Sequence, residues 1–298
     1  MTTNTTHGLA KVVAIVGPTG SGKTSLSIEL AEEFNGEIIC ADSRTVYRGM
    51  DIATAKPTRR EQKGVPHHLL DVAGPVETVT AAKFKQMANE ALKDVVSRGR
   101  LPFMVGGSGL YIDSVLYDFQ FPPPADAEAR RVLDGMELEE LGRLLESRDA
   151  AAYETIDRKN RRRVVRAIET AGQEKSQSRH VRVNTIILGL TMSKEVARER
   201  LSTRLQEMID IGLAEEAMRI GAEYGWDHPA VSAIGYGAFK GVFEGVKSIE
   251  EARDEILSSS LAYYKRQMTW FKRNPDVTWL ENPHEARSVL RSFLGSGV

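Results

Sequence analysis

Residues 17–24 combine glycines, a lysine and a threonine in the pattern of a phosphate-binding loop. The loop consists of Gly17, Pro18, Thr19, Gly20, Ser21, Gly22, Lys23 and Thr24. Glycines allow backbone angles that other residues avoid, so several N–H groups can converge on one anion. Lys23 adds a positive charge, and the Thr24 hydroxyl can hold Mg²⁺. The loop predicts binding of a diphosphate or polyphosphate, which could be ATP, another nucleotide or a different diphosphate.

Asp42 is the second candidate for chemistry, because it directly follows a short apolar segment at residues 37–41. A carboxylate at the end of a buried strand can bind the water shell of Mg²⁺, orient a substrate or accept a proton. The structural alternative is a turn or cap held by backbone N–H groups. Spacing alone leaves these roles open, but we expect Asp42 to face the phosphate loop across a crevice.

A third apolar segment, residues 101–105, ends in Gly106 and Gly107. Many ATPases with a phosphate-binding loop place a metal-binding aspartate at the end of such a strand. Its absence here argues against ATP hydrolysis as the main activity.

Two groups of basic residues suggest contacts with anions. Residues 158–166 contain six Lys or Arg side chains in nine positions, and such crowding on a helix favours a bound anion unless the helix face is simply solvated. Residues 265–273 place Lys and Arg beside Trp270 and Phe271. Aromatic and guanidinium groups together suit unstacked bases of RNA, although the two aromatic residues could equally be core.

Composition limits the class of protein. The 298 residues contain 40 Lys and Arg against 41 Asp and Glu, so any nucleic acid must bind a local basic patch. Cys40 is the only cysteine, which excludes an internal disulfide and a cysteine zinc finger. His67 and His68 are adjacent, would point to opposite sides of an extended segment, and do not suggest a metal site. With no signal peptide and no membrane-length apolar run, we expect a cytoplasmic protein.

The elements that must position these residues alternate between strand and helix. Apolar runs predict strands at residues 12–16, 37–41, 101–105 and 183–190, and helical periodicity follows the phosphate loop and returns at 80–99. This order predicts an α/β fold with a parallel sheet of the P-loop NTPase type. Residues 122–124 are three prolines and open a charged, helix-prone region. We therefore expect three parts: the first part of the core at 1–121, a helical insertion at 122–182, and completion of the core with C-terminal helices at 183–298. The last of these helices runs to residue 274.

Taken together, these segments resemble the tRNA dimethylallyltransferases, also called tRNA isopentenyltransferases, of the bacterial type. The resemblance covers nearly the whole chain and rests on motifs at residues 17–24, 41–57, 66–71, 105–111, 166–169 and 265–271. The first motif is shared with many unrelated enzymes. The run at 41–57, which begins Ala41-Asp42-Ser43-Arg44-Thr45, is close to diagnostic.

The resemblance implies transfer of a five-carbon group from dimethylallyl diphosphate to N6 of the adenosine on the 3′ side of the tRNA anticodon. Asp42 matches the family's general base, Thr19 matches a contact to the diphosphate, and Mg²⁺ would be held by Thr24. The tRNA contacts of the family fall on Asp42, Ser43, Arg44, Thr45, Ser108, Arg130, Arg162, Arg163, Val164, Val165 and Arg166. The target base must leave its stack to reach the crevice. We expect a monomer that binds the tRNA anticodon loop and no membrane.

The chain departs from the family pattern in three places. Ser232 stands where relatives commonly have Arg or Gln, Gly237-Ala238 replaces a basic-acidic pair, and Asn160-Arg161 replaces Asp-Pro. The first departure means that an additional cationic contact from that loop to the leaving diphosphate is not expected here.

Three other functions remain open on the residues alone. A P-loop kinase for a small molecule or nucleotide would use Asp42 to activate a hydroxyl. Prenyl transfer to free AMP or ADP would use the same diphosphate site, and an RNA-binding protein gated by a nucleotide would need no transfer chemistry. The basic insertion favours RNA over a free nucleotide.

Overall fold

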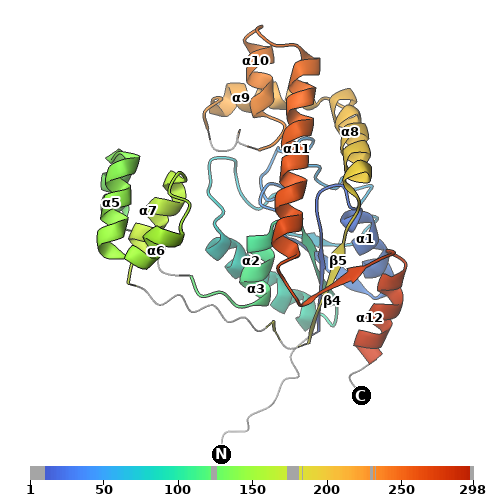
Figure 1. The fold of residues 1–298 in the computed structure, drawn as a ribbon. Helices are drawn as coiled ribbons and strands as arrows, with labels where there is room; N and C mark the ends of the chain where they lie inside the picture. The colour runs from blue at the N-terminus through green and yellow to red at the C-terminus, as the bar shows by residue number, and fades with distance from the viewer. Residues whose placement is uncertain are drawn as a thin grey trace, which may run out of the picture. The chain divides into compact units, whose positions relative to one another are not determined.

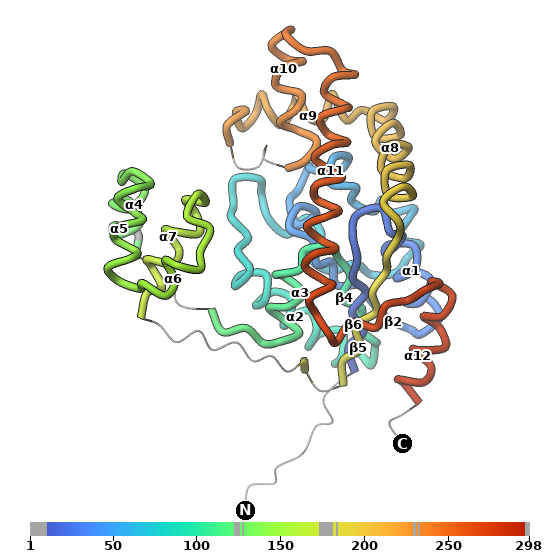
Figure 2. The backbone as a smooth tube through the Cα atoms, in the orientation of Figure 1, coloured from blue at the N-terminus to red at the C-terminus, as the bar shows by residue number. Residues whose placement is uncertain are grey.

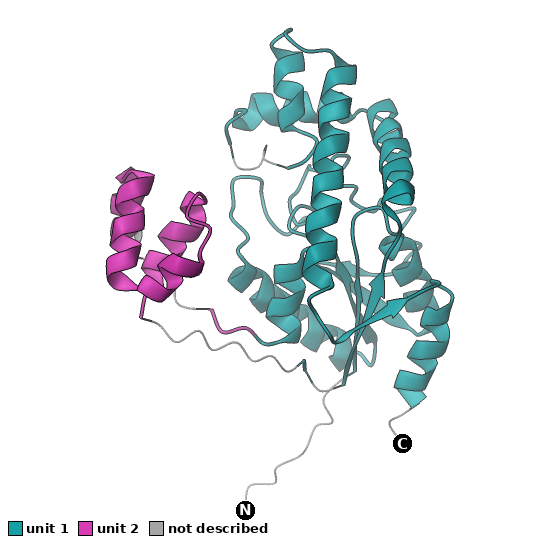
Figure 3. Cartoon of the chain, in the orientation of Figure 1, with its two compact units in different colours: residues 1–118, 179–298 teal, residues 119–178 magenta. Residues whose placement is uncertain are grey.

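The fold is described from a computed structural model, which covers residues 11–121, 126–172, 181–182, 184–228, 231 and 233–295 (Figure 1). Within these residues the contacts divide the chain into two compact units, residues 1–118 with 179–298 and residues 119–178 (Figure 3). The expected insertion, 122–182, begins three residues later and ends four residues later than the second unit.

Unit 1 contains a six-stranded sheet whose strand pairs are all parallel. The strands are β1 (Val12–Val16), β2 (Gly36–Cys40), β3 (His67–His68), β4 (Leu101–Gly106), β5 (Thr185–Leu190) and β6 (Val277–Leu280), in the order β3-β2-β4-β1-β5-β6. Every residue of β1 and β2 is buried, as expected for strands covered on both faces. The predicted α/β fold with a P-loop NTPase-like parallel sheet is confirmed.

Helices cover both faces of the sheet. The described helices of unit 1 are α1 (Lys23–Glu33), α2 (Ala81–Ser97), α3 (Gly109–Leu116), α8 (Lys194–Asp210), α9 (Leu213–Tyr224), η2 (Gly237–Phe239), α10 (Lys240–Phe243), α11 (Ile249–Phe271) and α12 (Glu285–Gly295). Of these, α9, η2 and α10 pack in a separate core away from the sheet (Figure 1). Helices α1 and α12 share a core with one face, while α2 and α3 contact β2 and β4 from the other. Figure 2 shows α8 and α11 running side by side above the sheet, where Leu201 packs against Tyr264 and Met268.

Strands β3 and β6, helices α3, α10 and α12 and the 3₁₀-helix η2 were not predicted from the sequence. β3 is only two residues long and lies in a region predicted to be irregular, so no periodicity could reveal it. β6 and α12 follow the last helix that the sequence predicts, and β6 is recognisable mainly by its pairing with β5. Val183, the predicted start of β5, lies outside the described residues.

Unit 2 is helical and has its own core. Its helices are α4 (Ala127–Gly135), α5 (Leu138–Arg148), α6 (Ala150–Thr155) and α7 (Arg161–Glu169). Leu141, Leu145, Val164, Val165 and Ile168 are its most buried side chains. None of the described helices of either unit is both long and apolar enough to cross a membrane.

Candidate active site

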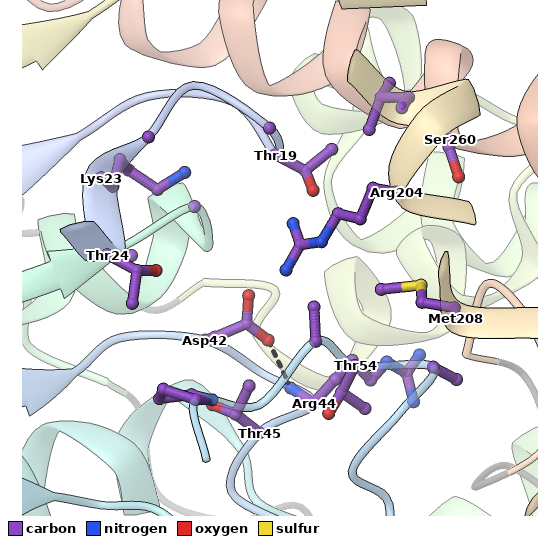
Figure 4. Close-up of a pocket in the computed structure, with 18 of the residues that line it drawn as sticks. Thr19, Lys23, Thr24, Asp42, Arg44, Thr45, Thr54, Arg204, Met208 and Ser260 are labelled. Carbon is purple, nitrogen blue, oxygen red and sulfur yellow. Dashed lines mark hydrogen bonds between the residues drawn. The ribbon is translucent and has the colours of Figure 1, made fainter. Parts of the chain in front are cut away.

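The carboxyl ends of β1, β2 and β4 open into one cavity of about 1180 Å³. Its lining comes from the phosphate loop, from the segments that follow β2 and β4, and from α8 and α11, all within unit 1. Figure 4 shows Thr19, Lys23 and Thr24 on one side and Asp42, Arg44 and Thr45 on another. The fold therefore brings the phosphate loop and the predicted base into the same space.

The phosphate loop has the backbone that its glycines suggested. Gly20 and Gly22 have φ angles of 78° and 87°, in the left-handed region that favours glycine. Gly22 is also the N-cap of α1 and offers no side chain to its first amide groups. These amides therefore remain free to bind an anion at the positive end of the helix.

Lys23 lies in this loop and reaches back over it, with its Nζ donating to the Pro18 carbonyl oxygen at 2.6 Å. Burial lowers the pKa of Lys23 to about 8, an effect that Asp42 opposes and that the positive charge of Arg204 reinforces. Lys23, Asp42 and Arg204 all line the same cavity (Figure 4), so their charges act on one space.

Arg204, on α8, is a site residue that the sequence analysis missed. Its guanidinium group points into the space between Thr19 and Asp42 (Figure 4). Burial lowers the pKa of Arg204, and the carboxylates of Glu61, Glu207 and Asp42 only partly offset this. Arg204 is half-buried and has no ion-pair partner among the described residues, so its charge is open to an anionic ligand. In the sequence, the one local indication of its role is that Arg204 follows Arg200 by four residues, which places both on one side of a charged helix. The same spacing is equally typical of a helix face exposed to solvent.

Asp42 both holds a turn and faces the cavity, the two roles that the sequence left as alternatives. One carboxylate oxygen accepts a hydrogen bond from the backbone N–H of Arg44 at 2.8 Å, which makes a tight turn after β2. The carboxylate also lines the cavity and points toward the phosphate loop (Figure 4). The turn fixes the direction of the side chain, and the free oxygen can accept a proton.

The neighbours of Asp42 also lie at the cavity. The backbone N–H of Ser43 donates to the Ser108 Oγ at 2.9 Å, which joins the segments after β2 and β4. The Thr45 Oγ1 is buried and has no hydrogen-bond partner among the described residues. Asp42, Ser43, Arg44 and Thr45 thus form a polar wall of the cavity.

Gln267, on α11, ties the phosphate loop to the end of β4. Its Oε1 accepts from the Thr19 backbone N–H at 2.9 Å, and its Nε2 donates to the Gly107 carbonyl oxygen at 3.0 Å. A side chain at Gly107 would collide with Gln267, and one at Gly106 would collide with the backbone of Ala41. Neighbouring atoms therefore occupy the place where a strand-end aspartate would stand.

The far part of the cavity is apolar. Its lining there includes Leu205, Met208, Leu213, Ile234 and Ile256, from α8, α9, α11 and the segment before η2. Apolar walls beside an anion site suit a ligand with a charged head and a hydrocarbon tail.

The residues of the cavity fit a Mg²⁺ ion bound together with phosphate oxygens. Mg²⁺ typically takes one or two protein oxygen ligands and completes its shell with phosphate and water. The exposed Thr24 side chain lies in the same cavity as Asp42 (Figure 4), so the Thr24 hydroxyl and the Asp42 carboxylate are both available to the ion or to its water shell. Among the described residues, no group of three or more His, Cys, Asp or Glu could hold a metal alone.

His67 and His68, which form β3, each contact a different residue. His68 Nε2 is 2.7 Å from Glu37 Oε2, whereas His67 Nδ1 is 2.8 Å from the Val65 carbonyl oxygen. His67 lines the cavity and His68 does not, as expected for adjacent residues of a strand.

The predicted tRNA contacts of unit 2 fall into two groups. Arg162 and Arg163 are exposed and have no ion-pair partner among the described residues. Arg130 and Arg166 both bind the carboxylate of Glu169, at 2.7 and 3.2 Å. Arg130 therefore joins α4 to α7, whereas the pair of Arg166 with Glu169 lies within α7.

Two other pairs of predicted residues, Val164 with Val165 and Trp270 with Phe271, are not fully exposed as an RNA-binding surface would require. The side chains of Val164 and Val165 are each 1% exposed in the core of unit 2, so they are not available to tRNA. Phe271 is core, as one alternative predicted, whereas Trp270 is 38% exposed and donates from Nε1 to Asp113 at 2.7 Å. Ser232, the first departure from the family pattern, lies outside the described residues.

Comparison with solved structures gives close matches to the whole chain. A tRNA isopentenylpyrophosphate transferase from Bacillus halodurans matches with a TM-score of 0.75 and 37% identity, over 96% of this chain and 97% of that one. A eukaryotic dimethylallyltransferase acting on tRNA matches with a TM-score of 0.86 over 96% of this chain and 80% of that one. At 23% identity, the second match supports the fold alone.

Sequence comparison agrees. A tRNA dimethylallyltransferase of Anoxybacillus flavithermus is 41% identical over 280 residues, which cover 91% of this chain and 90% of the relative. One from Bacillus anthracis is 40% identical over 300 residues, covering 96% of both chains. Residues 45–274 match the family described as IPP transferase. The chain belongs to the IPP transferase family.

Proposed function

We propose that this protein transfers the dimethylallyl group of dimethylallyl diphosphate to N6 of the adenosine on the 3′ side of the anticodon of tRNA. The observation that carries the proposal is the placement of Asp42 opposite a phosphate loop and two half-buried cations, in a cavity whose far part is apolar (Figure 4). Relatives at 40% and 41% identity are named tRNA dimethylallyltransferase, which favours this function over a kinase.

The diphosphate would bind at the phosphate loop. The loop amides, Lys23 and Arg204 would hold its oxygens, and Thr24 would hold a Mg²⁺ ion that neutralises part of its charge when bound. Arg204 supplies a cation in the cavity of a chain that has Ser232 where relatives commonly have Arg or Gln. The apolar lining would accommodate the five-carbon group and exclude water from it.

In the transfer step, the adenine N6 attacks the first carbon of the dimethylallyl group. A C–N bond forms, the C–O bond to the diphosphate breaks, and the electron pair leaves with the diphosphate. Negative charge grows on the departing oxygens, where fixed amides and cations in a site of low polarity stabilise it most. Asp42 would accept the proton that N6 loses, which leaves a neutral secondary amine.

The tRNA would contact both units. Asp42, Ser43, Arg44, Thr45 and Ser108 lie at the cavity or bind its lining, where a base that has left its stack would arrive. Arg162 and Arg163 would bind backbone phosphates. Arg130 and Arg166 would contribute indirectly, because both bind Glu169 of α7. We expect a monomer acting in the cytoplasm, where the single buried Cys40 would remain reduced.

The experiment incubates the protein with labelled dimethylallyl diphosphate and Mg²⁺, with total tRNA or AMP as acceptor. We expect label in tRNA and none in AMP. Label in AMP alone would favour a free-nucleotide prenyl transferase. Label in neither acceptor, with phosphate transfer from ATP, would favour the kinase.

A further inference from the structure

Glu216, on α9, is a buried carboxylate that binds three successive backbone amides. It is 8% exposed, and its Oε2 accepts from the N–H groups of Asp51 and Ile52, both at 3.0 Å. Its Oε1 accepts from Ile52 and from Ala53, also at 3.0 Å. The Tyr236 hydroxyl donates to the same Oε1 at 2.8 Å.

This arrangement satisfies a group that is otherwise costly to bury. A carboxylate removed from water is tolerated only when hydrogen bonds replace its hydration. Bonds from amides to a charged acceptor are about twice as strong as those between neutral groups. Burial, together with the negative charge of Glu216, raises the pKa of Tyr236 well above its ordinary value. Tyr236 therefore keeps its proton and remains a donor at neutral pH.

The amides that Glu216 binds begin a wall of the cavity. Ala53, the last of these residues, lines the cavity together with Thr54 and Ala55, and Thr54 lies near Arg44 in Figure 4. This segment belongs to no strand or helix, so no ladder of backbone bonds fixes its position. Its other anchors among the described residues include Lys56, which binds the Tyr47 carbonyl oxygen at 2.7 Å and Asp71 at 2.5 Å, and the Thr54 hydroxyl, which donates to the Met50 carbonyl oxygen at 2.6 Å.

Tyr236 follows a second wall segment. Ala233, Ile234 and Gly235 also line the cavity. Gly235 has a φ angle of 114°, and a Cβ there would lie 3.0 Å from the Cβ of Ala53, so the two segments are in direct contact. Glu216 thus joins two walls that are about 180 residues apart in the sequence, since Ala53 and Ile234 differ by 181 positions.

We propose that Glu216 is a positioning residue: with Tyr236, it holds residues 53–55 and 233–235 at the separation that admits the acceptor base to the cavity. This inference rests on the proposed function and adds a determinant of it that does not touch the reacting atoms. The phosphate loop depends on other elements, so diphosphate binding should not depend on Glu216.

The test uses the full chain with E216Q, Y236F and the double variant. The glutamine side chain in E216Q directs an NH₂ group at backbone N–H donors of residues 51–53. Some of these hydrogen bonds should be lost, so that residues 53–55 are held less firmly. We expect the single-turnover transfer rate to fall about tenfold and the KM for tRNA to rise several-fold. The Kd for inorganic pyrophosphate, measured by calorimetry without tRNA, should stay within about twofold, because this probe lacks the five-carbon group that Ile234 would contact. Y236F should lose about threefold in rate, and the double variant should resemble E216Q because the tyrosine acts through the glutamate.

The matched control is E37Q. Glu37 is also a buried carboxylate, 3% exposed, with several donors, namely Arg98 and His68, and neither Glu37 nor these partners line the cavity. E37Q should lower the thermal midpoint without changing the transfer rate of the folded protein.

Three outcomes would overturn the inference: wild-type kinetics in E216Q, an equal loss of diphosphate binding, or the same kinetic loss in E37Q. If E216Q does not fold, Y236F decides alone, because it removes one donor and leaves the charge; unchanged kinetics in Y236F would then reject the inference. Absence of transfer by the wild-type protein in the same assay would instead reject the proposed function.

Discussion

The cations of the cavity and those of helix α7 are held in opposite ways. Lys23 and Arg204 are half-buried in the cavity, and burial lowers the pKa of each. Arg162 and Arg163 are exposed to solvent on a separate helical unit. A charge in a site of low polarity acts strongly over a short range, whereas an exposed charge is screened by salt within about 10 Å.

The comparison teaches that the two regions should affect different kinetic quantities. The enclosed charges can act on the growing charge of a transition state, so their loss should lower the rate of transfer. The exposed charges attract a polyanion before any chemistry, so their loss should weaken tRNA binding and its salt dependence.

Removing the carboxylate of Asp42 should have the largest effect. We expect D42N to lower the single-turnover rate by about 10²- to 10⁴-fold, the usual contribution of a general base. Asn can still accept the hydrogen bond from the Arg44 amide, so the turn should survive. Dimethylallyl diphosphate should bind as tightly as before or more tightly, because a negative charge near Lys23 is lost. An unchanged single-turnover rate would remove Asp42 from its role.

Loss of Arg204 should come next. R204A should lower the transfer rate by about 10²-fold, comparable to the loss of one donor from an oxyanion site, and raise the Kd for dimethylallyl diphosphate. Arg198 is the matched control, since it is exposed on the same helix and does not line the cavity. Equal losses in R204A and R198A would mean that the overall charge of α8, and not the enclosed guanidinium, matters.

The lowered pKa of Lys23 predicts a pH dependence of diphosphate binding. Lys23 is charged below pH 8 and loses its proton as the pH rises through about 8. Above this pH, the Kd for dimethylallyl diphosphate should increase with pH, by at most about tenfold for each pH unit. The reason is that Lys23 must take up a proton before it can bind the diphosphate as a cation. Calorimetry between pH 7 and 9.5 without an acceptor measures this. The same Kd at both ends would show that Lys23 is not the titrating contact.

Removal of the exposed arginines should have the smallest effect. R162A combined with R163A should raise the KM for tRNA about three- to tenfold and leave the single-turnover rate at saturating tRNA unchanged. Each lost phosphate contact should reduce the slope of log K against log salt by about 0.7 to 0.9. The control removes Arg143 and Arg148, which are exposed on α5 of the same unit. If both double variants behave alike, α7 is an ordinary solvated face.

The sequence alone was sufficient for the parts of the fold in which neighbouring residues act together. The phosphate loop, the buried strands before it and after α1, and the α/β architecture follow from glycine conformations and apolar periodicity. The dipeptide strand β3 and the edge strand β6 could not be predicted in this way, because pairing with a distant strand defines them. Val164 and Val165 show the reverse limit: a family motif assigned them to tRNA, and packing placed them in the core.

Only the tertiary structure decided which polar side chains serve the site. Gln267 meets Thr19 across 248 residues, and Glu216 meets Ile52 across 164. Arg204 lies on a charged helix whose local pattern is typical of a solvated surface. A polar residue has no fixed role of its own, since its hydrogen bonds and the polarity of its surroundings depend on what the fold places beside it. The sequence therefore determined where a phosphate would bind, and the fold determined which distant groups surround it.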